Sequence, residues 1–332
     1  MVRYGILGFG NHGVKRLVPG FAGAKESALA GIWRRDMQKA KSQAEEFGIE
    51  HVFPSAEEMC ASSAIDAVVV TSPDALHMRD TLLAISHGKP VLCEKPAAMN
   101  ADQLKRMLAK ASSANVAFGI AQNFRYNRSV NLVREWVQQG RIGSPIFATA
   151  QFCFQAENSP RKWIYDPALA CGGPIGDVGI HCMDALRYVL MDDVSAVTAL
   201  ARRDALSGNL EASAALAIEF TRGTLGSILV SFRAKYHSWM EVVGEEGVIQ
   251  SDDCFTVDNP VQVVLRQHGE IVDMQRVTNE DAYSLMLDGF SAAIDGSCTY
   301  AAPGKDAINN QMALDAAFAS MQSGSKQIVK KF

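Results

Sequence analysis

The sequence predicts an α/β domain built on a parallel sheet, followed by an α+β domain with a large, mostly antiparallel open sheet. In the first third of the chain, short runs of Val, Ile and Ala alternate with helical segments at intervals of about 25 residues, which is typical of a parallel sheet covered on both faces. Further on, apolar and polar residues alternate with period two, which favours antiparallel strands with one covered face. We therefore expect a first domain at residues 1–122 and a second at 123–332.

Length and composition fit two globular domains. The chain has 332 residues, of which 48% are hydrophobic and 20% are charged, as in ordinary globular proteins. The 32 basic and 36 acidic residues leave a net charge of −4, so no basic field exists to attract a nucleic acid. We expect no signal peptide, because the N-terminus lacks a basic region followed by a long apolar run. We also expect no membrane span, because no apolar run approaches 18 residues.

The seven cysteines are scattered along the chain and form no C-x-x-C pair. This pattern argues against a disulfide framework and against a cysteine-rich zinc site, and it favours a reducing compartment. We therefore expect a cytoplasmic protein without a bound metal.

The elements of the first domain follow from apolar runs and from capping residues. Strands are predicted at 2–7, 28–33, 65–71, within 89–96 and at 116–123. Helices are predicted at 14–23, at 36–47, after the turn at 72–77, and at 100–114. Pro19 makes the first helix short or kinked, and Asp36 and Gly48 are typical start and stop residues for the second.

The second domain is predicted to mix period-two strands with three helices. Its strands are expected at 146–155, 194–203, 212–220, 224–233 and 261–267, with turns at 221–224 and 244–247. Its helices are expected at 129–139, 174–190 and 304–324.

Three glycines directly after the first strand carry the first functional signal. Gly8, Gly10 and Gly13 form G-x-G-x-x-G between a predicted strand and a predicted helix, and Phe9, Asn11 and His12 complete the loop. The first glycine permits a tight turn, the second lets the backbone approach a pyrophosphate, and the third lets helix and strand pack closely. The alternative is a tight turn without a ligand; the strand-to-helix context favours a Rossmann dinucleotide-binding domain.

The end of the second strand bears on the choice between NADP and NAD. Arg34 and Arg35 follow Trp33, where NAD enzymes usually carry a carboxylate. Two guanidinium groups suit a 2′-phosphate, so we favour NADP. The alternatives are two solvated arginines, or Asp36 as a ribose ligand with NAD as the cofactor.

Further motifs resemble those of one oxidoreductase family. They are Thr71–His77, Glu94-Lys95-Pro96, Trp163, Asp166–Ala170, Gly172-Gly173, Asp177-x-Gly179-x-His181 and the 244–247 turn. Together with the glycine loop, the whole chain resembles the glucose–fructose oxidoreductase/inositol dehydrogenase (Gfo/Idh/MocA) family. The resemblance implies a cofactor at the carboxyl edge of the parallel sheet. It also implies a sugar, cyclitol or polyol substrate, and a homodimer or homotetramer formed through the second-domain sheet.

Lys95, Asp177 and His181 are the candidate catalytic residues. Lys95 follows a strand where open α/β sheets bind ligands, so its ammonium is expected to act on the substrate oxygen; the alternative is an exposed loop lysine. The resemblance also implies a cis Lys95–Pro96 bond.

Asp177 and His181 are four residues apart and are expected to share a helix face, with histidine as the acid/base near neutral pH. Their structural alternative is a helix-start carboxylate and a core histidine, and metal ligation is a weaker interpretation.

The remaining candidates have mixed interpretations. Ser72, His77, Glu94 and Trp163 are expected near the cofactor, although His77 also fits a helix surface and Trp163 also fits a core. Arg125 and Asn127 are expected to face the substrate, and Asp184 to orient His181 or to pair with an arginine such as Arg187. His12 departs from the small or aliphatic residue usual in this loop.

These residues predict an NADP-preferring oxidoreductase acting on a hydroxyl or carbonyl of a sugar, cyclitol or related polyol. One alternative is a reductase of trans-dihydrodiols or anhydro sugars. Another is a nucleotide-binding regulator without catalysis, which the presence of Lys95, Asp177 and His181 disfavours.

Overall fold

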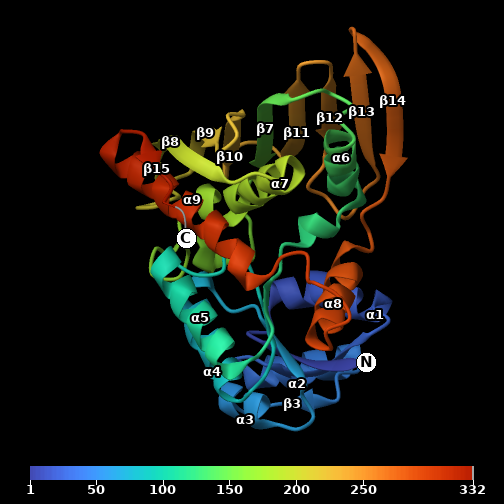
Figure 1. Cartoon of the computed structure of the whole chain (residues 1–332). Coiled ribbons are helices and arrows are strands. Elements are labelled where there is room, and N and C mark those ends of the chain that lie inside the picture. Colours follow the sequence, from blue (N-terminus) through green and yellow to red (C-terminus); the bar gives the residue numbers. More distant parts are fainter. Residues whose placement is uncertain (331–332) are drawn as a thin grey trace. The chain divides into compact units, whose positions relative to one another are not determined.

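The computed structural model describes residues 1–330, which form two compact units (Figure 1). The first unit contains Met1–Asn123 and Tyr283–Ile308, and the second contains Phe124–Ala282 and the chain from Asn309 onward. The segment 283–308, expected in the second domain, therefore belongs to the first unit. Within residues 1–330, no helix is both long and apolar enough to cross a membrane.

The first unit is built on a parallel sheet with the strand order β3-β2-β1-β4-β5-β6. The strands are β1 (Val2–Leu7), β2 (Ser27–Trp33), β3 (His51–Val52), β4 (Ala67–Val70), β5 (Val91–Cys93) and β6 (Phe118–Ile120). Every residue of β4 and β5 is buried, as the continuous apolar runs predicted. This order reverses direction between β1 and β4, which is the point where Rossmann sheets bind their ligand.

The helices of this unit begin and end largely as the capping residues predicted. They are α1 (Val18–Gly23), α2 (Met37–Phe47), α3 (Ala56–Ala61), α4 (His77–Ser86), α5 (Ala101–Ala114) and α8 (Ala282–Ile294). A π-helical turn, Gly13–Leu17, precedes α1, and Pro19 lies in the first turn of α1. Asp36 accepts a hydrogen bond from the Lys39 N–H at the start of α2, and Gly48 ends that helix with φ +66°.

Helix α8 explains why 283–308 joins the first unit. Its Ser291 hydroxyl lies 2.8 Å from the Tyr4 hydroxyl on β1 and 2.8 Å from the Ser27 hydroxyl on β2. Asp288 accepts a hydrogen bond from the Ser27 hydroxyl and from the Lys25 and Glu26 N–H groups. These polar contacts attach α8, a mostly apolar helix, to the first two strands.

The second unit is a mostly antiparallel sheet with the order β14-β13-β12-β11-β7-β10-β9-β8-β15 in the described chain. Its strands are β7 (Pro145–Cys153), β8 (Val194–Arg202), β9 (Ser213–Phe220), β10 (Leu225–Ser231), β11 (His237–Gly244), β12 (Val248–Asp252), β13 (Val261–Gln267), β14 (Glu270–Val277) and β15 (Gln327–Ile328). Only the β7–β10 pair is parallel among these pairings. The predicted turns at 221–224 and 244–247 connect β9 to β10 and β11 to β12.

Helices α6 (Arg128–Gln138), α7 (Ile180–Leu190) and α9 (Gly304–Ser323) cover one face of this sheet (Figure 1). Alternate residues such as Leu216, Ile228 and Val242 point into the core beneath them and are at most 2% exposed. The expectation of one covered face is confirmed. The sequence did not reveal β14, because its residues are all exposed or half-buried and show no alternation.

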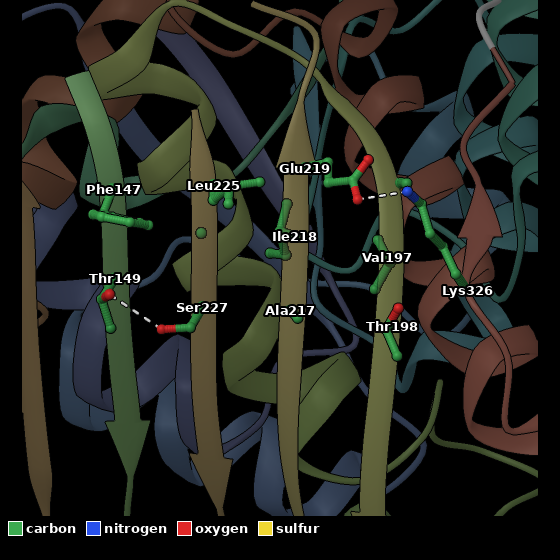
Figure 2. A pocket seen from close by; sticks show the side chains of 12 residues that line it. Phe147, Thr149, Val197, Thr198, Ala217, Ile218, Glu219, Leu225, Ser227 and Lys326 are labelled. Carbon is green, nitrogen blue, oxygen red and sulfur yellow. Dashed lines mark hydrogen bonds and ion pairs between the residues drawn. The ribbon is translucent and has the colours of Figure 1, made fainter. Parts of the chain in front are cut away.

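The opposite face of the sheet carries apolar side chains at its surface. Phe147 on β7 is 51% exposed, and Leu225 and Leu229 on β10 are 48% and 41% exposed. A hollow of about 420 Å³ lies over β7, β10, β9 and β8, and the Glu219–Lys326 ion pair closes one side of it (Figure 2). We call this surface the outer sheet face.

Candidate active site

The glycine loop follows β1 in the geometry that the motif predicted. Gly8 has φ +90°, and a Cβ there would lie 2.6 Å from the Ser72 backbone nitrogen, so only glycine fits. The Gly8 and Phe9 N–H groups each donate to the Trp33 carbonyl at 3.0 Å, which ties the loop to the end of β2. The Phe9 side chain is buried against Gly13 and serves packing, so its contact with the cofactor would come from its backbone and stays a prediction.

The carboxyl edge of this sheet fits a dinucleotide. The glycine loop and the helix that follows it begin at the end of β1, beside the point where the strand order reverses between β1 and β4. Helix N-termini favour anionic phosphate groups. Ser72, which follows β4, has a buried hydroxyl that makes no hydrogen bond within residues 1–330. A buried polar atom without a partner needs a ligand or water to satisfy it. Asn11 is exposed in the same loop.

Glu94 and Lys95 occupy the end of the neighbouring strand β5. The Glu94 N–H donates to the Val70 carbonyl at 2.9 Å, and Lys95 directly follows with a cis bond to Pro96, as expected. Glu94 Oε1 lies 2.8 Å from His12 Nε2 of the glycine loop. Burial raises the pKa of Glu94, but His12 and Lys95 outweigh it and hold the pKa below its usual value. His12 therefore joins the phosphate loop to the loop that carries Lys95.

His77 lies inside the protein, so the alternative of a helix-surface position is wrong. It is 1% exposed, and its two ring nitrogens lie 2.8 Å from the carbonyl oxygens of Ser72 and Pro96. Its direct role toward the cofactor stays a prediction.

The two arginines after β2 differ in their surroundings. Arg34 is half-buried and donates to Gln43 on α2 at 2.5 Å, whereas Arg35 is exposed. Neither makes an ion pair with another described residue. Asp36 uses its carboxylate as the α2 cap, which weakens its interpretation as a ribose ligand.

In the second unit, Asp177 lies in a π-helical turn, Ile175–Gly179, directly before α7. Both of its carboxylate oxygens accept hydrogen bonds from Arg161, at 2.9 and 2.7 Å. Only glycine fits at position 173, just before this turn, because a Cβ there would lie 2.1 Å from the Glu211 carbonyl oxygen. The Glu211 side chain accepts the Ile175 N–H at 2.9 Å. Burial raises the pKa of Glu211, although hydrogen bonds from the backbone N–H groups of Gly173 and Ile175 act in the opposite direction.

His181 occupies the first turn of α7, four residues after Asp177, as predicted. It is 7% exposed, and its ring centre lies 4.5 Å from that of Phe124. Trp163 is half-buried in the short helix Lys162–Tyr165, where it packs beside Ile164 and Phe232. The core interpretation of Trp163 is supported by this packing, and its contact with a cofactor stays a prediction.

Arg125 and Asn127 are both buried and hydrogen-bonded within the second unit, and their contact with the substrate stays a prediction. Arg125 is 7% exposed and forms a forked ion pair with Asp184, at 2.9 and 2.5 Å. Asn127 is fully buried and donates to the backbone carbonyls of Cys254 and Thr256. Both side chains serve the packing of the second unit, because burial and strong partners occupy them.

Asp184 pairs with an arginine, as one of its two interpretations expected, but the arginine is Arg125 and not Arg187. Asp184 accepts from Arg125 and from the Asn310 amide of α9 at 2.6 Å. Arg187 instead pairs with Asp193 and donates to Asn310. Glu211 and Asn310 are site-supporting residues that sequence reasoning missed. Nothing local marks them, since they act on residues 36 and 126 positions away.

Comparisons with known proteins agree with this geometry. The family model "Oxidoreductase family, NAD-binding Rossmann fold" matches residues 2–122, and "GFO/IDH/MocA C-terminal domain" matches residues 130–250. Inositol 2-dehydrogenase of Acidiphilium cryptum is 30% identical, over 88% of this chain and 85% of that protein. The 1,5-anhydro-D-fructose reductase of Ensifer adhaerens is 28% identical, over 93% and 92%. A solved aldose-aldose oxidoreductase from Caulobacter crescentus shares the fold with a TM-score of 0.89 and 23% identity, over 98% and 99%.

The strand order, the glycine loop and the matched domains define an NAD(P)-binding oxidoreductase with a Rossmann domain and a second, mostly antiparallel domain. The chain belongs to the GFO/IDH/MocA oxidoreductase family.

Proposed function

We propose that this protein transfers a hydride between NADP and a hydroxyl or carbonyl carbon of a sugar, a cyclitol or a related polyol. The observation that carries the proposal is the position of Lys95, directly after β5 at the carboxyl edge of the parallel sheet. Glu94 beside it is paired with His12 of the glycine loop. Open α/β sheets bind ligands at this edge, so the ammonium is well placed to act on a substrate oxygen.

When bound, the nicotinamide would accept or supply the hydride. Residues of the chain would then manage the proton: Lys95 polarises the substrate oxygen, and His181 acts as acid or base near neutral pH. Arg161 occupies one direction on each Asp177 oxygen. Asp177 would accept a hydrogen bond from a substrate hydroxyl and so position the substrate.

The relatives support the substrate class. One acts by its name on inositol, a cyclitol, and another on an anhydro sugar. The second name favours the alternative of an anhydro-sugar reductase on the same scaffold. Reduction of trans-dihydrodiols is a further alternative. A panel of polyols, aldoses, anhydro sugars and dihydrodiols, followed by NADPH absorbance in both directions, separates these substrates.

Replacing Lys95 or His181 tests the catalytic roles. We expect Lys95→Ala and His181→Ala each to lower kcat by about a hundredfold or more, as for loss of a general acid or base. Circular dichroism and the melting temperature check folding, and His181→Gln serves if the alanine variant unfolds. The exposed Lys110→Ala and His237→Ala variants are matched controls. Near-normal turnover in Lys95→Ala or in His181→Ala would refute the role of that residue.

We further propose a cytoplasmic homodimer or homotetramer that associates through the outer sheet face. Exposed Phe147, Leu225 and Leu229 on neighbouring strands support the association, because contiguous apolar surface commonly marks a protein interface. Within residues 1–330 the cysteines form no disulfide bond, which fits a reducing compartment.

A further inference from the structure

The two ring nitrogens of His77 both face hydrogen-bond acceptors. Nε2 lies 2.8 Å from the Ser72 carbonyl, and Nδ1 lies 2.8 Å from the Pro96 carbonyl. A carbonyl oxygen accepts hydrogen bonds and cannot donate them. A neutral imidazole carries one N–H and one bare lone pair, so it would place that lone pair against one of the two oxygens. Only the imidazolium form satisfies both contacts.

The surroundings of His77 favour this charge. Burial by itself lowers the pKa of His77, but Cys93 on β5, Asp74 in the turn before α4 and the Pro96 carbonyl raise it to about 10. Asp74 is buried, which strengthens its attraction for a nearby cation. Electrostatics and hydrogen-bond geometry thus agree.

We propose that His77 is a permanently protonated positioning residue that clamps together the two loops after β4 and β5. One loop carries Ser72, whose hydroxyl is available at the cofactor edge, and the other carries Lys95 next to Pro96. The clamp holds the backbone on which Lys95 is mounted, and this consequence rests on the proposed catalytic role of Lys95. The protonation state of His77 does not rest on it.

Nitrogen-15 NMR tests the protonation directly. Protein with labelled histidine rings is studied at about pH 8, where an ordinary histidine with pKa near 6.5 is neutral. We expect both nitrogens of His77 to carry a proton. The signal is assigned by its loss in His77→Gln, or by replacing the other six histidines singly if that variant does not fold. A spectrum with one bare nitrogen at His77 would overturn the proposal.

His77→Gln and His87→Gln test the positioning role as a matched pair. His87 ends the same helix and contacts Glu57 at the surface. We expect His77→Gln to lower kcat at saturating substrate by about tenfold or more, since misplaced catalytic groups cost this much. The NADPH dissociation constant should also rise, while His87→Gln changes neither. Unchanged kcat and cofactor binding in a folded His77→Gln enzyme would refute the clamp, whereas an active Lys95→Ala would refute only the role of Lys95.

The pH dependence of unfolding gives a third readout. Between about pH 6.5 and 10, folded His77 keeps a proton that the unfolded chain has lost, so stability falls as the pH rises. The unfolding equilibrium constant should increase by up to about tenfold per pH unit. Six cysteines are buried, and their thiols also lose protons on unfolding as the pH approaches about 8.5, the ordinary pKa of a thiol. Urea unfolding is therefore measured between about pH 7 and 8, and the thiol contribution cancels in the comparison with His77→Gln. The slope should be smaller in His77→Gln, and an equal slope contradicts the proposal.

Discussion

Two ion pairs of the second unit show how burial sets the energetic weight of a single residue. In the Arg125–Asp184 pair, the side chains are 7% and 3% exposed, whereas in the Arg161–Asp177 pair they are 29% and 12% exposed. Removing one partner of a buried pair leaves a charge without compensation. Water still screens the second pair in part. The first pair is therefore expected to govern stability, and the second to govern local order.

Asp184→Asn is expected to destabilise the protein by about 3–5 kcal/mol, because Arg125 would remain buried without its counter-charge. Urea unfolding monitored by fluorescence measures the loss. The double variant Arg125→Met/Asp184→Leu should recover much of it, since apolar residues of similar volume often replace a buried pair without cost. A loss below about 1 kcal/mol in Asp184→Asn contradicts a buried, fully paired role.

Arg35→Ala is expected to raise KM for NADP by about tenfold or more while changing KM for NAD little, since a guanidinium contact with a phosphate is worth more than 1 kcal/mol. Arg35 is exposed and has no ion-pair partner in residues 1–330, so it is available to a 2′-phosphate. Lys41→Ala removes a charge from the exposed side of α2 and serves as the control. A clear preference of the unmodified enzyme for NAD would refute the NADP assignment.

At the scale of elements, the segment 156–170 before α7 depends on few anchors. Ile164, Ala156 and Phe232 form a small apolar cluster, and Arg161 ties the segment to the turn that carries Asp177. Loop segments with few buried apolar contacts are usually among the least stable parts of a fold. The Arg161–Asp177 ion pair is therefore expected to contribute much of the stability of this segment.

Arg161→Gln is expected to loosen this segment by about 1 kcal/mol, because the arginine is partly exposed. Amide hydrogen exchange over 156–170 should then accelerate about fivefold. Lys162→Gln is the control, since the exposed Lys162 bonds within residues 1–330 only to the Glu157 carbonyl, at 3.3 Å. Equal exchange in the two variants would show that Arg161 does not anchor the segment.

Many elements were predictable because their signals are local. Asp36 and Gly48 bound α2 by their own backbone and side-chain geometry, and buried strands such as β4 are continuous apolar runs. β3 has two residues, too few for any periodicity. Exposed β14 lacks the alternation on which strand prediction depends, and α8 turns its polar Asp288 and Ser291 toward the sheet while apolar Leu285 is exposed, the reverse of the usual pattern.

At the scale of the whole molecule, the outer sheet face is the surface best suited to association. Leu225 faces Phe147 across the β10–β7 pair, and small Ala215 and Ala217 line the neighbouring strand. The outer sheet face thus carries both large and small apolar side chains on neighbouring strands, an arrangement that suits packing against a second sheet.

The double variant Leu225→Glu/Leu229→Glu is expected to convert the oligomer into a monomer, because burying two carboxylates in an apolar interface is costly. Size-exclusion chromatography with light scattering measures the mass at several protein concentrations. Leu285→Glu is the control, since Leu285 is 46% exposed on α8, which belongs to the first unit and not to the sheet. A monomeric unmodified protein, or an intact oligomer in the double variant, contradicts association through this face.

The sequence by itself determined the fold class, the glycine loop and the candidate catalytic residues. Gly8 shows why: its backbone angle and its close approach to Ser72 leave no alternative to glycine, so the requirement is visible in the motif. Only the tertiary structure decided the partners of the charged residues. Asp184 meets Arg125 and Asn310, 59 and 126 positions away, and His77 meets two carbonyls inside the protein. Such pairings depend on which surfaces become buried together, and burial is a property of the folded chain.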